Sequence, residues 1–92
     1  GRLVLDAGAV KAIIERGVSL LPARVTEVEG EFISGDAIEL VGPDMKVIAR
    51  GLVAFDSEEI PQMLGRSTKE LAASLGVEYE RELVHRDDLV LL

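Results

Sequence analysis

The only histidine of the chain begins the segment His85-Arg86-Asp87-Asp88-Leu89. Its first three residues have the order of a protein-kinase catalytic loop, in which an asparagine five positions after the aspartate binds magnesium. Here Leu92 stands at that position, and neither a glycine-rich loop nor a strand lysine comes before it. The segment is therefore interpreted as a polar turn that enters a final strand.

A catalytic triad would place His85 between a nucleophile and an orienting acid. Asp87 and Asp88 are acids of the right kind. None of the serines lies in a nucleophile-elbow pattern, Gly-x-Ser-x-Gly. A structural or interface role is favoured for His85. The serines are Ser19, Ser34, Ser57, Ser67 and Ser74.

Two acidic groups raise the question of a metal site. Asp36, Glu39 and Asp44 lack the Asp-x-Asp-x-Asp-Gly pattern of a calcium loop. Three glutamates spaced by two, from Glu27 to Glu31, would share one face of a strand. A solvated acidic face is the favoured interpretation, and a weak magnesium site stays open.

Gly65-Arg66-Ser67-Thr68 places an arginine beside a predicted helix start, which is a place where phosphate binds. The Gly-x-x-x-x-Gly-Lys pattern of a phosphate loop is absent. A glycine that ends one helix, followed by a capping box that starts the next, explains these residues better.

Local patterns predict the elements that position these residues. Asp6 is a helix N-cap, Val10 and Ile13 share one helical face, and Gly17 ends a helix over 7–16. Further helices are expected over 56–65 and 67–76. Strands are expected at 3–5, 25–29, 37–41, 47–55 and 89–92, with a hairpin around Pro43.

This order predicts a mostly β fold with short helices at the ends of a small, partly open barrel. The 92 residues form one domain, and 48% of them are hydrophobic. Because aromatic residues are few, the core must be built from Val, Ile, Leu and Ala.

The amino-acid composition excludes several kinds of functional site. The absence of cysteine excludes disulfides, zinc–thiolate sites and cysteine nucleophiles, and fits a cytoplasmic location. No stretch is long enough for a membrane span, and no signal peptide is visible. Because the chain starts at Gly1 and structure starts almost at once, we expect a fragment of a longer protein.

The net charge of −7 disfavours nucleic acid as a partner. Lys11, Arg16 and Arg24 form one local basic patch in the sequence, without an aromatic stacking platform beside it. Two interpretations stay open for this patch: an RNA contact, or ordinary surface charge paired with Glu15 and Glu27.

Several segments in a fixed order resemble a PUA domain, the family named for pseudouridine synthases and archaeosine transglycosylases. The resemblance covers the whole chain and is closer to the PUA domains at the C-terminus of bacterial, and specifically actinobacterial, glutamate 5-kinases. It rests on Asp6-Ala7-Gly8-Ala9, Ser19-Leu20-Leu21-Pro22, Gly35-Asp36, Ile48-Ala49-Arg50-Gly51, Val28-Glu29-Gly30-Glu31-Phe32, Leu64-Gly65-Arg66-Ser67 and the ending Val84 to Leu89.

The resemblance implies a β pseudo-barrel with helices at its edges. It also implies a parent enzyme that transfers phosphate from ATP, with magnesium, to glutamate in proline synthesis, typically inhibited by proline. All of that chemistry would lie in an N-terminal kinase domain, so neither catalytic residues nor cofactors transfer to this chain. The implied partners are that kinase domain and neighbouring subunits.

In RNA-modifying relatives, the first helix and the loop after it face RNA. The resemblance therefore makes Lys11, Arg16, Ser19 and Arg24 the candidate RNA-binding residues. Arg24 and Met45 stand where the family commonly has glycine, so backbone strain is a question at both positions. Two functions stay in view: a non-catalytic regulatory or assembly module, and an RNA-binding module. An independent enzyme is disfavoured.

Overall fold

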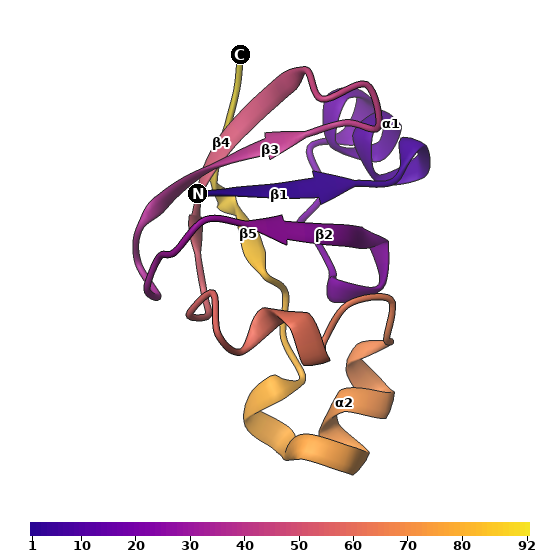
Figure 1. Cartoon of the computed structure of the whole chain (residues 1–92). Helices are drawn as coiled ribbons and strands as arrows, with labels where there is room; N and C mark the ends of the chain where they lie inside the picture. Colours follow the sequence, from indigo (N-terminus) through magenta and orange to yellow (C-terminus); the bar gives the residue numbers. More distant parts are fainter.

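The computed structural model describes residues 1–92 as one curled sheet with helices at its ends (Figure 1). No helix in it is long and apolar enough to cross a membrane. The strands are β1 (Arg2–Leu5), β2 (Val25–Glu29), β3 (Ala37–Val41), β4 (Val47–Val53) and β5 (Val84–Leu91). The helices are α1 (Ala7–Arg16) and α2 (Thr68–Leu75), with 3₁₀ helices η1 (Pro22–Arg24), η2 (Ile60–Gln62) and η3 (Val77–Tyr79).

The sheet has the order β2-β1-β3-β4-β5, and only the pair β1–β3 is parallel. Its two edges are drawn toward each other by Leu20, which precedes β2 and forms a bridge with Val84 of β5. The Leu20 amide donates to the Val84 carbonyl at 2.9 Å, and the Leu83 amide donates to the Leu20 carbonyl at 2.8 Å. The predicted mostly β fold with short helices is confirmed.

The core is one cluster of buried apolar side chains enclosed by the curled sheet. α1 contributes Ala9 and Ile13, and α2 contributes Leu71. Phe32 and Phe55 are the only aromatic residues in the cluster, so the predicted aliphatic core is confirmed. No polar or charged residue is buried.

The predicted helices agree with the structure in two cases out of three. Asp6 and Gly17 bound α1, and the Ser67 hydroxyl accepts from the Glu70 amide at 3.1 Å to start α2. The helix predicted over 56–65 is wrong: turns and the short η2 occupy this stretch. Pro61 lies inside η2 and has no amide hydrogen to donate, which removes a hydrogen bond from a longer α-helix over this stretch.

The turn predicted at His85 is also wrong, because this residue and the acidic residues after it lie within β5. β5 starts at Val84, which pairs with Val53 on one side and with Leu20 on the other. These two pairings fix the backbone, and the polar side chains that follow stay exposed on an edge strand.

Met45 is the only residue other than glycine with a positive φ, at 65°. Its amide donates to the Gly42 carbonyl at 2.9 Å in the turn between β3 and β4. Arg24, the other position where glycine was expected, lies in η1 without a positive φ. The backbone strain is therefore at Met45.

Met45→Gly is expected to raise the free energy of unfolding by about 0.5–1 kcal/mol, because relief of left-handed strain exceeds the added chain entropy. Urea unfolding measures it. Lys46→Gly, where φ is not positive, is the control and is expected to lower stability. Equal losses in both variants would contradict the assignment of strain to Met45.

Candidate binding surface on the first helix

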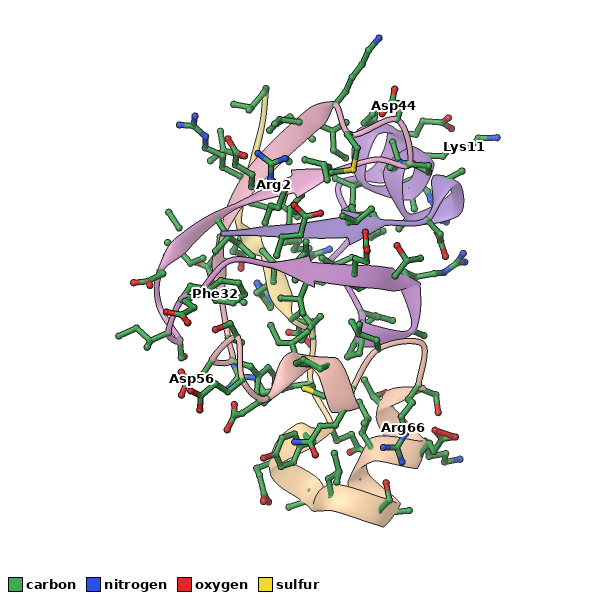
Figure 2. All side chains as sticks on the ribbon, viewed as in Figure 1. Arg2, Lys11, Phe32, Asp44, Asp56 and Arg66 are labelled. Atoms are coloured by element: carbon green, nitrogen blue, oxygen red, sulfur yellow. The ribbon has the colours of Figure 1, made fainter.

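α1 carries two of the four candidate residues on its exposed side. The Asp6 Oδ1 atom accepts from the Ala9 amide at 2.7 Å and starts the helix. Gly17, with φ at 60°, ends it, and its amide donates to the Ile13 carbonyl at 3.0 Å. Because Ala9 and Ile13 face the core, Lys11 and Arg16 are left in solvent; Figure 2 shows Lys11 pointing away from the molecule.

The segment after α1 is held by bonds to distant parts of the chain. The Ser19 Oγ atom accepts from the Arg86 amide at 2.8 Å, so this side chain is tied to β5. At the other end of the segment, the Arg24 carbonyl accepts from the Asp6 amide at 2.9 Å. The loop therefore has a fixed position against the start of α1.

A cavity of about 250 Å³ lies between α1 and this loop. Ile13, Leu20 and Leu21 give it an apolar lining, and Arg16 and Arg24 line it as well. Ser19 also lines this cavity, so three of the four candidate residues meet there. Lys11 lies outside it, on a second hollow of about 330 Å³ that shares Arg16.

The charges of this surface are largely free. Arg24 Nη1 lies 3.6 Å from Asp6 Oδ2, and this pair is too exposed to add much stability. The same guanidinium lies against Gly8, where an added Cβ would come within 2.6 Å of it. No ion pair involves Lys11 or Arg16, so neither of them makes the pairing with Glu15 or Glu27 that one of the two interpretations included.

His85 lies among carboxylates without a nucleophile. Its Nε2 atom is 3.8 Å from Glu82 and its Nδ1 atom 3.5 Å from Asp87, whose amide donates to Nδ1 at 3.1 Å. No hydrogen bond joins it to a serine: Ser19 accepts from a backbone amide, and the Ser34 hydroxyl donates to a backbone carbonyl. This arrangement gives no support to nucleophilic catalysis.

The acidic candidates have structural partners. Glu39 pairs with Arg2 at 3.1 Å, Asp36 accepts from the Ile33 amide, and Asp44 accepts from the Lys46 amide. No group of three or more acidic or histidine side chains lies close enough to hold a metal ion. The structure gives the magnesium alternative no support.

The Arg66 side chain forms hydrogen bonds with η2 and with α2, so it is not free to bind an anion. Its guanidinium donates to Glu70 at 2.8 Å, to the Gln62 carbonyl at 3.1 Å and to the Ser74 hydroxyl. Figure 2 places it against α2. These bonds support the interpretation of this stretch as a glycine stop followed by a capping box.

Apolar side chains line the candidate site, which was not predicted from the sequence. Leu20 and Leu21 stand directly before Pro22, and nothing in that short run distinguishes lining residues from ordinary core. The contact of Leu20 with β5 joins residues more than sixty positions apart, which no local pattern reports.

A family profile described as PUA domain matches residues 1–75. Glutamate 5-kinases align with all 92 residues: that of Frankia casuarinae is 64% identical, that of Streptomyces avermitilis 63% and that of Deinococcus radiodurans 47%. The aligned region is 24–25% of these relatives, so the chain spans about a quarter of their length.

Two solved structures share the fold. A PUA domain from Aeropyrum pernix, crystallised as a tartrate complex, gives a TM-score of 0.67 at 22% identity, over 94% of this chain and 41% of that one. A PUA domain protein from Thermoplasma acidophilum gives a TM-score of 0.62 at 18% identity, over 99% of this chain and 46% of that one.

Proposed function

The chain belongs to the PUA domain family, and we propose that it is a non-catalytic regulatory or assembly domain of a glutamate 5-kinase. The supporting observation is the alignment of the complete chain with about a quarter of each glutamate 5-kinase relative. The absence of a nucleophile–base pair around His85 agrees with a role outside the chemistry.

In this proposal the parent enzyme transfers phosphate from ATP to the side-chain carboxylate of glutamate. ATP and magnesium bind in the remaining part of the polypeptide. The domain acts through contacts with that part or with neighbouring subunits, in the cytoplasm. It changes the response to an effector only if those contacts differ between two states of the enzyme.

Deletion of residues 1–92 from the full-length protein tests this role. We expect glutamate-dependent ATP turnover to persist, with a changed response to proline or a changed oligomeric state. Steady-state kinetics and light scattering measure the two properties. Loss of all turnover from a folded remainder would place catalytic residues in this domain and contradict the proposal.

RNA binding is the second candidate, because the 250 Å³ cavity gathers Arg16, Ser19 and Arg24 beside an apolar lining. Lys11 would extend the same surface along α1 through the hollow that it shares with Arg16. The net charge of −7 opposes this candidate, so its test includes the salt concentration.

Arg16→Glu combined with Arg24→Glu is expected to weaken binding to a structured RNA about tenfold or more, because two phosphate partners become repulsive. Fluorescence anisotropy at low and moderate salt measures it, with Lys69→Glu on α2 as the control. Absence of binding by the unaltered protein at both salt concentrations removes this candidate.

A further inference from the structure

One row of side chains crosses the open face of the sheet from edge to edge. Glu29 is opposite Arg2, Arg2 is beside Glu39, Glu39 is opposite Arg50, and Arg50 is opposite Val90. Residues in register on neighbouring strands point to the same face. The row therefore alternates in charge over four strands and ends in an apolar residue on β5.

The charges in this row are not fully matched. Arg2 Nη2 lies 3.1 Å from Glu39 Oε1, and Arg2 Nε lies 4.0 Å from Glu29 Oε1. Arg50 takes part in no ion pair and no side-chain hydrogen bond. It is an exposed guanidinium with no anionic partner.

Apolar side chains surround Arg50. Leu52, two residues along β4 on the same face, is 45% exposed, and Val90 is 64% exposed. β5 is an edge strand, so Val90 has a paired strand on one side only. We call Arg50, Leu52 and Val90 the β5 patch. Exposed apolar residues on an edge strand favour association with another segment, and covering the edge is one way in which proteins prevent aggregation there.

The β5 patch borders a broad hollow whose lining includes the first residue of the chain and Arg50 of the patch. The hollow, about 570 Å³, is lined by Gly1, Arg2, Glu39 and Arg50 among others. The Gly1 carbonyl accepts from the Glu39 amide at 3.0 Å, so the start of the chain is fixed on this face. Figure 1 shows the N-terminus at the start of β1, and Gly1 lines the same hollow as Arg50 of β4.

We propose that the β5 patch docks against the part of the polypeptide that precedes residue 1. This rests on the proposed function, since the aligned region is the C-terminal quarter of the glutamate 5-kinase relatives. A preceding domain would be joined to this one at Gly1, so the sheet face around the hollow that Gly1 lines is the surface nearest to the junction. The surface that fits it carries a carboxylate for Arg50 and apolar side chains for Leu52 and Val90.

Other occupants fit the patch less well. A stable interface between separate molecules uses about 20–30 residues a side, and the patch offers only Arg50, Leu52 and Val90. A tethered neighbour needs far less contact, because a short linker gives an effective concentration in the millimolar range. Glu29 and Glu39 in the same row repel the phosphates of a nucleic acid.

Cysteine labelling of the full-length protein tests this docking. Val90→Cys and Leu52→Cys are reacted with a maleimide, and mass spectrometry of peptides gives the rate at each position. Lys69→Cys, exposed on α2, is the matched control. We expect labelling at both patch positions to be at least about tenfold slower than at the control. Arg50→Glu, added to either variant, is expected to restore most of the rate.

Labelling of both patch cysteines at the control rate would overturn the proposal. Protection lost on dilution would assign the patch to a second copy, and protection that requires added RNA would assign it to nucleic acid; either result overturns it. The deletion experiment separates the two proposals. If the patch cysteines are protected but deletion of the domain leaves the kinetics unchanged, the regulatory role is rejected and the docking surface stands. If deletion changes the kinetics but the patch cysteines react at the control rate, the docking surface is rejected and the regulatory role stands.

Discussion

Leu20→Ala is expected to lower the free energy of unfolding by about 3 kcal/mol. Leu20 is 1% exposed and packs in the core cluster where the segment before β2 meets β5. Truncation leaves a void at the junction that draws the two sheet edges together. Urea unfolding should show a lower midpoint with an unchanged slope.

Leu21→Ala is the matched control, because this neighbour has the same side chain and is 44% exposed. We expect a loss of less than about 1 kcal/mol there. Equal losses at the two positions would contradict the assignment of Leu20 as the residue that joins the edges of the sheet.

Gly51→Ala is expected to lower the free energy of unfolding by about 2 kcal/mol, because the added methyl overpacks the β4–β5 contact. A Cβ at Gly51 would lie 2.5 Å from Val84 Cγ1 and 3.2 Å from the Asp88 carbonyl. Gly51 pairs with Leu89 and Val53 with Val84, so the register shifts between them and β5 passes close to Gly51.

A double-mutant cycle with Val84→Ala separates this clash from a general effect of glycine loss. Val84→Ala removes the methyl nearest to the new Cβ, so the double variant should be more stable than the sum of the single losses predicts, by about 1 kcal/mol. Strict additivity would contradict the clash. Leu52→Ala, at the exposed neighbour, should change stability by less than about 0.5 kcal/mol.

Local signals predicted the elements whose ends are set by local bonds. Asp6 and Gly17 bound α1 through contacts within four residues, and Ser67 starts α2 in the same way. The β3–β4 hairpin followed from the turn at Pro43 between two apolar runs. In each case the hydrogen bonds that define the element join residues that are close in the sequence.

The wrong predictions arose where distant contacts decide the structure. The acidic start at 56–59 favours a helix, but Ser57 is bound to Phe32: its amide and its hydroxyl both donate to the Phe32 carbonyl. Similarly, the sequence around His85 favoured a turn because the start of β5 is set by Val84, whose pairing partners Leu20 and Val53 lie far away in the sequence.

The candidate site was predicted in part for the same reason. Lys11 and Arg16 follow from the spacing of α1, and the resemblance singled out Ser19 and Arg24. The cavity that joins three of them is lined in part by Leu20, whose position depends on its bridge to β5. The β5 patch could not be predicted, because it needs the register of five strands.

The most direct test of the central claim is a proline titration of glutamate-dependent ATP turnover in the full-length protein and in the protein lacking residues 1–92. Coupling between separate sites is typically worth about fivefold or more in an effector constant. We predict that turnover persists without the domain and that the half-inhibitory proline concentration shifts by about that factor, or that the oligomer dissociates. Identical kinetics, inhibition and oligomeric state in the two proteins would contradict the claim.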